Sequence, residues 1–241
     1  LYYGADCSAT VGDTLAAREK LTRLTSLYYN NYTQRGYERL AQLAAAGADW
    51  KVASDAYRRL AEVATSPSER RAALEKYLSS AITLGNGEVT VEVADHIISH
   101  PEVTPELSRK ALFNKAVALE GLGKRNPAVA IYSSLAEDVT TIEGAESNFR
   151  LIETAFRFGS FEKAEEMVYE FAEKNTPHAY WLARAFLLLG DVYVSRGDLF
   201  QARATYQSVV DGYSDGDDGI VEMARQKVEA LSAEGETSVA N

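Results

Sequence analysis

Two histidines on one predicted helix face are the first residues in this chain whose types and spacing suggest chemistry. His96 and His100 are one helical turn apart and Glu92 lies one turn earlier, so the face would present two imidazoles and a carboxylate, which are ligands that zinc accepts. A zinc protease would carry a glutamate directly after the first histidine, and Ile97 stands there instead. We therefore expect a solvated or capping histidine pair, and no metal site.

Three shorter motifs also fall short of a site. The acidic stretch Asp215–Gly219 begins like a calcium loop, but glycine occupies its fifth position and the bidentate glutamate is missing. The stretch Gly121–Lys124 lacks the preceding strand and the upstream glycine of a phosphate-binding loop. Cys7 beside Ser8 has no histidine near it in sequence. We expect helix caps and ends at the first two stretches, a packed thiol at Cys7, no cofactor, and no enzyme activity.

The amino-acid composition and net charge indicate which kinds of partner the chain can bind. The chain has 35 acidic and 25 basic residues, and its net charge of −10 would repel a phosphate backbone and anionic lipid head groups. No apolar run approaches the roughly 20 residues that a membrane-spanning helix needs. A single cysteine excludes an intrachain disulfide without fixing the compartment. We expect a protein or peptide partner, no nucleic acid and no membrane insertion, and leave the cytoplasm and the periplasm or cell envelope open.

The elements that would position functional residues are clearest near the C-terminus. Thr176–Pro177 is typical of a helix start, because proline is tolerated in the first turn. Phe186, Leu189, Gly190 and Tyr193 then fall at i, i+3, i+4 and i+7, so they share one face of a helix. The glycine on this face predicts a close approach of the facing helix.

A second helix is predicted after a short turn. Gly197 can adopt the left-handed conformation that ends a helix, and Asp198 can cap the next one. Ala202, Tyr206 and Val209 then form a second apolar stripe. The two stripes together predict a pair of packed antiparallel helices.

This pattern resembles the tetratricopeptide repeat, whose signature is matched by Phe186, Leu189, Gly190, Tyr193, Ala202, Tyr206 and Val209. The small residue of the second helix recurs at intervals of roughly 34–41 residues, near the repeat length of about 34, at Ala17, Ala53, Ala94, Ala128, Ala164 and Ala202. The resemblance implies an all-α, right-handed α-α superhelix of about five to six helix pairs with a C-terminal capping helix. It covers residues 1–231, which we expect to form one solenoid.

The two ends of the predicted solenoid differ. Val221–Leu231 is expected to form the polar-faced capping helix, and residues 232–241 a disordered tail. Leu1–Tyr3 begins the chain with apolar surface, so we expect a segment of a longer array that can self-associate through this uncapped end. Within the array, Pro101 is expected to end one second helix early.

Tyrosines cluster around one predicted turn between repeats, at Tyr28, Tyr29 and Tyr32. Tyrosine offers a large contact area and a hydroxyl group, so one interpretation is an aromatic anchor for a partner. Tyrosine also fills junctions between repeats. We favour the packing interpretation.

In the resembled family, first-helix residues off the packing stripe line a concave groove that binds extended peptides or partner helices. Transferred to this chain, these predicted groove residues are Arg35, Glu38, Arg39, Gln42, Lys76, Lys110, Asn114, Phe149, Arg150, Glu153, Arg157, Arg184 and Asp191. Asn114 and Arg150 match two positions of the carboxylate clamp found in chaperone-binding members of the family. Glu75, Ser79 and Glu146 replace three other positions, so we do not expect that clamp.

Three groove residues form a predicted line of charge. Arg150, Glu153 and Arg157 are spaced at i, i+3 and i+7, and the two guanidiniums would bind acidic groups of an extended peptide. Phe149 and Phe156 would offer apolar contact beside them. The alternative is that Glu153 merely pairs with both arginines on an exposed helix.

The resemblance implies a non-enzymatic scaffold that binds a peptide or a partner protein in the groove, similar to arrays of large bacterial scaffold proteins. The alternative function is an accessory or regulatory domain of a larger cell-envelope enzyme or of a peptide-sensing signalling protein.

Overall fold

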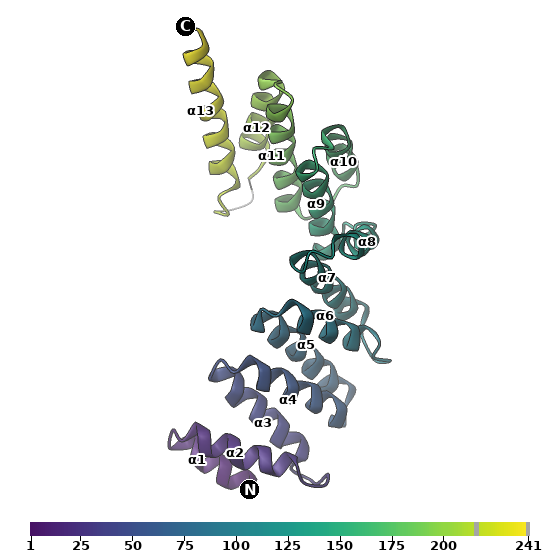
Figure 1. The fold of residues 1–241 in the computed structure, drawn as a ribbon, viewed down its shortest axis with the longest axis vertical. Helices are drawn as coiled ribbons and strands as arrows, with labels where there is room; N and C mark the ends of the chain where they lie inside the picture. The colour runs from purple at the N-terminus through teal and green to yellow at the C-terminus, as the bar shows by residue number, and fades with distance from the viewer. Residues whose placement is uncertain (215–216, 240–241) are drawn as a thin grey trace. The chain divides into compact units, whose positions relative to one another are not determined.

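The computed structural model describes residues 1–214 and 217–239, and within these ranges the secondary structure is entirely helical (Figure 1). The all-α fold built from successive helix pairs is therefore confirmed. The helices are α1 (Tyr2–Thr10), α2 (Thr14–Thr25), α3 (Thr33–Ala46), α4 (Trp50–Val63), α5 (Pro67–Leu84), α6 (Gly87–Ile98), α7 (Pro105–Gly121), α8 (Arg125–Leu135), α9 (Ile142–Arg157), α10 (Phe161–Glu173), α11 (Ala179–Ser195), α12 (Leu199–Gly212) and α13 (Ile220–Val239).

The helices gather into two compact units, Leu1–Ala128 and Val129–Asn241, where the sequence predicts one solenoid over residues 1–231. Within the first unit, each helix from α1 to α6 packs against the next helix in the chain. Within the second unit, α9 to α13 also pack in sequence, and α11 in addition contacts both α9 and α13 directly. Each unit is therefore a stack of helix hairpins.

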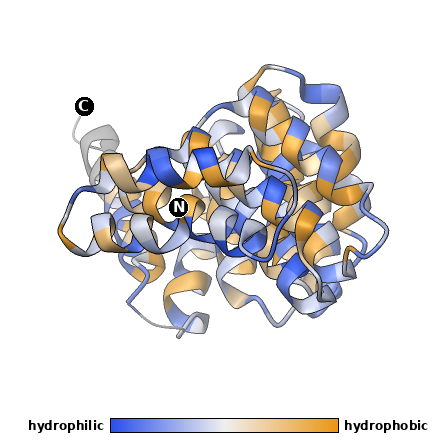
Figure 2. Ribbon diagram, turned by 90° about the horizontal axis from the view of Figure 1, so that it is seen from below, coloured by the Kyte–Doolittle hydropathy of each residue, from blue (hydrophilic) through white to orange (hydrophobic). Residues whose placement is uncertain are grey.

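The ladder of small residues predicted for the second helices is confirmed. All six alanines are buried, with at most 1% of their surface exposed, at Ala17, Ala53, Ala94, Ala128, Ala164 and Ala202. Figure 2 shows that hydrophobic (orange) and hydrophilic (blue) residues alternate along the helices. The expected interruption is also present, because α6 ends at Ile98 and Pro101 is exposed. Ile97 supplies the buried apolar residue at the end of that helix.

The helix ends follow the predicted capping residues. Gly197 has a φ of +79°, and the Asp198 side chain accepts a hydrogen bond from the backbone N–H of Gln201 at 3.0 Å. Ser66 and Glu69 form a reciprocal capping box at the start of α5. These local hydrogen bonds satisfy N–H groups that have no partner within the helix.

Asn148 occupies a position where the repeat signature predicts a bulky residue, and the structure explains this departure. The side chain is buried, and its Nδ2 donates to the carbonyl oxygens of Ala136 and Gly144, each at 3.0 Å. Lys174 Nζ donates to Asn148 Oδ1 at 3.2 Å. A Cβ atom at Gly144 would overlap the carbonyl oxygen of Asp138, so the α8–α9 connection lies directly against α9. The buried amide thus has protein partners for both its Nδ2 and its Oδ1, and it links α9 to the residue after α8 and to Lys174.

Two predictions near the N-terminus are wrong. Cys7 is exposed and not packed, because α1 buries Ala5 and Ser8 on its packing face. Tyr28 and Tyr29 also do not fill a repeat junction, since Tyr28 is 98% exposed and Tyr29 is 65% exposed. Within that cluster Tyr32 does pack, because its ring stacks on the ring of Tyr2 in α1.

One predicted helix start near the C-terminus, at Thr176–Pro177, also differs from the structure. α11 begins at Ala179 because Thr176 Oγ1 accepts from the backbone N–H of His178 at 3.1 Å and donates to the carbonyl of Val139 at 2.8 Å, which holds residues 176–178 outside the helix. The helix α13 spans Ile220–Val239, and the disordered tail at residues 232–241 stays a prediction. Residues 240–241 of that stretch lie outside the described residues.

The contact between α11 and α12 generates a stability prediction. A Cβ atom at Gly190 would overlap the ring of Tyr206, so Gly190→Leu should lower the free energy of unfolding by about 1–3 kcal/mol or more. Ala202→Leu should act in the same direction, because Ala202 is fully buried. Gln201→Leu is the control, since Gln201 is exposed and its change should stay within about 0.5 kcal/mol. Urea unfolding measures all three, and wild-type stability of Gly190→Leu would contradict the contact.

Candidate partner-binding site

Arg184 of α11 lies at the centre of an aromatic cluster in the second unit. Its Cζ atom is 4.4 Å from the ring centroid of Phe149, 5.5 Å from that of Trp181 and 5.8 Å from that of Tyr180. Phe149 belongs to α9, and its ring lies 5.6 Å from that of Trp181. We call these four residues the α9–α11 face. Their rings attract the guanidinium and orient it, while its N–H groups stay available to acceptors.

The packing of α9 against α11 explains why these residues meet. Tyr180, Trp181 and Arg184 fall on one side of α11, toward α9, because residues three and four apart share a helix face. Phe149 is 4% exposed and serves as the base of the cluster. Its position was predicted as an exposed apolar contact of the groove, whereas the ring is covered by α11.

The predicted line of charge on α9 is present as two ion pairs. Glu146 accepts from Arg150 at 3.0 Å, and Glu153 pairs with Arg157 at 3.0 Å, each pair spanning one helical turn. Glu146, which the sequence analysis did not assign to the line, is therefore the partner of its first arginine. Arg184 differs from both arginines, because no hydrogen bond or carboxylate partner is found for it among the described residues.

Asp191 was predicted to line the groove, and its carboxylate accepts hydrogen bonds from two other side chains of the protein. Its Oδ1 accepts from the Tyr206 hydroxyl at 2.6 Å and from Lys227 Nζ at 2.5 Å. Burial of the ring, together with this hydrogen bond, raises the pKa of Tyr206, so the hydroxyl remains protonated and donates at neutral pH. Asp191 therefore joins α11 to α12 and α13.

The predicted groove residues of the first unit make mainly local contacts. Arg35 is exposed, and Glu38 and Lys76 border one small hollow of about 110 Å³. Two residues form ion pairs, Arg39 with Asp6 at 3.3 Å and Lys110 with Glu106 at 2.7 Å. Two donate hydrogen bonds, Gln42 to the Glu38 carboxylate at 3.4 Å and Asn114 to the Lys110 carbonyl at 2.7 Å. The ammonium group of Lys76 lies 5.6 Å from the centroid of the Tyr57 ring. The structure thus brings only Glu38 and Lys76 of this set together in a concave place.

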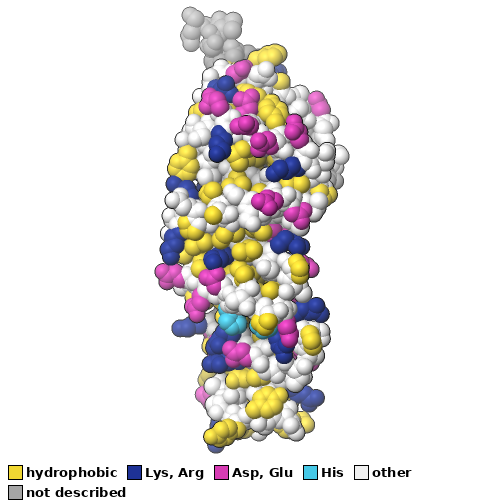
Figure 3. Space-filling model, turned by 90° about the vertical axis from the view of Figure 1, so that its right-hand side faces the viewer, with side chains coloured by type: hydrophobic (Ala, Val, Ile, Leu, Met, Phe, Trp, Pro, Cys, Tyr) yellow, Lys and Arg dark blue, Asp and Glu magenta, His cyan; other side chains and the backbone are white. Residues whose placement is uncertain are grey.

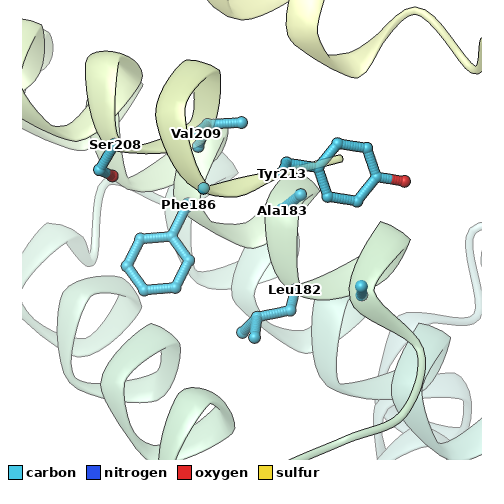
Figure 4. A pocket seen from close by; sticks show the side chains of 8 residues that line it. Leu182, Ala183, Phe186, Ser208, Val209 and Tyr213 are labelled. Carbon is cyan, nitrogen blue, oxygen red and sulfur yellow. The ribbon is translucent and has the colours of Figure 1, made fainter. Parts of the chain in front are cut away.

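A larger hollow lies between α11 and α12, and the sequence analysis did not predict it. Its volume is about 320 Å³. Figure 4 shows Leu182 and Phe186 of α11, Val209 of α12 and Tyr213, which directly follows α12, around it. Phe186 and Val209 belong to the apolar stripes of the sequence. Whether the apolar faces of two helices are in full contact or leave a gap depends on the distance between the helices. The spacing of apolar residues in the sequence does not determine that distance.

The histidines do not form a metal site. His96 packs edge-on against Tyr77 at 5.7 Å between ring centroids, and His100 Nδ1 accepts from the backbone N–H of Glu102 at 3.2 Å. Within the described part of the chain, no three His, Cys, Asp or Glu side chains are placed to hold a metal ion. The stretch Asp215–Gly219 lies partly outside the described residues. None of the described helices combines the length and the hydrophobicity of a bilayer-spanning segment.

The surface charge of the second unit is uneven. In Figure 3, acidic side chains gather over this unit, and α10 carries the exposed residues Glu162, Glu166, Glu170 and Glu173. The α9–α11 face instead presents a guanidinium. An acidic group that is repelled by most of the surface would therefore meet attraction at Arg184.

Comparisons with known proteins agree with the helix-pair fold. Residues 184–216 match the tetratricopeptide repeat family. The chain is similar in structure to BtubC (BKLC) from P. vanneervenii, with 16% identity, a TM-score of 0.54, and coverage of 86% of this chain and 92% of that chain. It is also similar to the apo form of the quorum sensor NprR from B. thuringiensis, with 12% identity, a TM-score of 0.57, and coverage of 95% and 67%. No curated protein matches the chain. At these identities the similarity concerns the fold alone.

The carboxylate of Asp191 generates a second prediction. Asp191→Ala should destabilise the protein by about 1–3 kcal/mol, because it leaves the buried Tyr206 hydroxyl without its acceptor and removes the partner of Lys227. Asp211→Ala is the matched control, since Asp211 is exposed and accepts one hydrogen bond from Gln207. Chemical unfolding compares the two variants. Equal, small effects would mean that Asp191 is free to serve a partner.

Proposed function

Because the chain is a tetratricopeptide repeat protein, we propose that it acts as a non-enzymatic scaffold that binds a protein or peptide partner on the α9–α11 face. The repeat fold supports a role in protein–protein interaction. The observation that carries this assignment is Arg184, a guanidinium stacked on three aromatic rings without a carboxylate partner among the described residues.

The chemistry of this face favours an acidic group of the partner. Arginine bonds a carboxylate through two parallel N–H donors, and its stacking on Phe149 limits the entropy lost when that bond forms. Trp181 and Tyr180 are half-buried, so part of each ring remains open to contact. Tryptophan, tyrosine and arginine are the residue types most enriched among energetic hot spots of interfaces.

The position of the aromatic residues supports a binding role over a packing role. The family match begins at Arg184, whereas α11 begins at Ala179. Tyr180 and Trp181 therefore lie in the first turn of α11, ahead of the matched residues. Large aromatic side chains in this first turn, left half-buried, provide contact area for a partner.

The two ion pairs of α9 would form the edge of the site. The Arg150–Glu146 pair is part-buried, whereas the Arg157 guanidinium is open to solvent, so a partner carboxylate would compete for Arg157 more readily than for Arg150. The side chain of Arg157 is 56% exposed and is the more accessible of the two arginines. We propose that Arg150, Glu153 and Arg157 adjust the register of the bound segment, and that Arg184 anchors it.

A regulatory, peptide-sensing domain is the alternative function. It would use the same face, and it requires that ligand binding changes the packing of neighbouring helices. Asp191 lies on α11 with Arg184 and holds α12 and α13, so such a change would reach α13. Hydrogen exchange in α13 upon addition of a bound peptide distinguishes the alternatives, because a simple scaffold leaves that exchange unchanged.

The anchoring role of Arg184 generates a third prediction. Fluorescein-labelled peptides with a Glu or Asp next to an aromatic residue should bind, and Arg184→Gln should weaken the tightest of them at least about tenfold, which corresponds to about 1.4 kcal/mol. Fluorescence polarisation at low and physiological salt measures the affinity. The variant removes the charge and keeps a similar length.

The matched control is Arg203→Gln, because Arg203 is an exposed arginine of α12 outside the α9–α11 face. Thermal melts establish that both variants remain folded. Equal binding of an acidic peptide by the Arg184→Gln variant and the wild type would exclude Arg184 as the anchor.

A further inference from the structure

The hollow between α11 and α12 faces away from Arg184. Leu182 and Phe186 each lie two residues from Arg184, which is about 200° around an α-helix. The two features are therefore on opposite sides of α11. A ligand in the hollow would bind independently of the α9–α11 face.

We propose that this hollow binds one large apolar side chain, such as leucine or phenylalanine, from a partner segment that carries lysine or arginine beside it. The walls are formed mainly by carbon atoms of Leu182, Phe186 and Val209, together with the ring of Tyr213 (Figure 4). The volume of about 320 Å³ lies at the lower end of the range of about 300–1,000 Å³ for ligand pockets. It therefore suits a single anchoring side chain better than an entire helix.

Small residues line the hollow and leave it unfilled. Near Gly190 the helices are in tight contact, as the overlap of a Cβ atom with the Tyr206 ring indicates. Around the hollow, Ala183, Ser208 and Gly212 are too small to fill the space. A Cβ atom at Gly212 would meet nothing within 4 Å. Leu182 and Phe186 consequently remain half-buried, and an apolar partner would complete their burial.

Negative charge beside the hollow favours a partner with positively charged residues next to its apolar side chain. Asp211, Asp217 and Asp218 are exposed, and the Tyr213 hydroxyl donates a hydrogen bond to Asp218. No lysine or arginine occurs in residues 211–224. Lysine or arginine next to the apolar anchor would therefore be attracted to this rim.

The same charge disfavours two other occupants. A second copy of this chain would bring a net charge of −10 to an acidic rim. An anionic lipid surface would be repelled for the same reason. A basic segment of a different protein remains the occupant that matches both the apolar walls and the acidic rim.

The test uses three labelled peptides and the whole chain. The first peptide has one central leucine between pairs of lysines, the second replaces the leucine by alanine, and the third replaces the lysines by glutamates. We expect the first peptide to bind at least about tenfold more tightly than either of the others, and more weakly as salt is raised. Equal binding of the alanine peptide would overturn the apolar anchor, and equal binding of the glutamate peptide would overturn the charge preference.

Variants then locate the binding site. Gly212→Leu should fill the hollow and abolish binding of the leucine peptide. Gly121→Leu is the matched control, because Gly121 also ends a helix, α7, and a Cβ atom there also meets nothing within 4 Å. Ser208→Leu, at an exposed wall of the hollow, replaces Gly212→Leu if that variant does not fold.

A charge change on the other side of α11 completes the test. Arg184→Gln should leave binding of the leucine peptide unchanged, because its side chain lies opposite the hollow. Loss of binding in Arg184→Gln, or full binding in folded Gly212→Leu, would place the peptide elsewhere and overturn the proposal.

Discussion

The close approach of α11 and α12 at Gly190 is the contact on which the second unit depends. With no side chain at Gly190, the ring of Tyr206 lies directly against α11, and its hydroxyl reaches Asp191 in the next position of the chain. The same carboxylate accepts from Lys227 of α13. One apolar contact and one carboxylate thus hold three helices in a defined arrangement, because a buried hydroxyl is stable only with its acceptor in place.

This arrangement gives α11 two different surfaces. The side toward α9 carries Arg184 on its aromatic rings, and the side toward α12 closes tightly at Gly190 and opens at Ala183. The residues of helix that precede the matched repeat contribute to both surfaces, through Trp181 on one side and Leu182 on the other. The first turn of α11 therefore contributes side chains to both surfaces.

The charge distribution distinguishes these surfaces from each other and from the remainder of the unit. α10 and the residues before α13 are acidic, whereas the α9–α11 face presents arginine. Charge on a surface acts mainly on encounter and on the choice of partner, while burial of apolar area supplies most of the affinity. The two proposed sites would accordingly favour partners of opposite charge, and each combines its charge with apolar or aromatic area.

The sequence by itself determined the elements that depend on local chemistry. The period of the apolar residues specified the helices, the alanine ladder specified which face of each second helix is buried, and Gly197 with Asp198 specified a helix end. These features are set by residues within one or two turns of each other, so they can be predicted without knowledge of the fold.

Only the tertiary structure decided which predicted groove residues are available to a partner. Arg184 and Asp191 have equivalent positions in the sequence pattern, yet Asp191 is held by two other helices and Arg184 is stacked on rings from its own helix and α9. The division into two compact units and the hollow beside Phe186 were likewise absent from the pattern. Their cause is the distance between helices, which depends on contacts between residues far apart in the chain and not on periodicity.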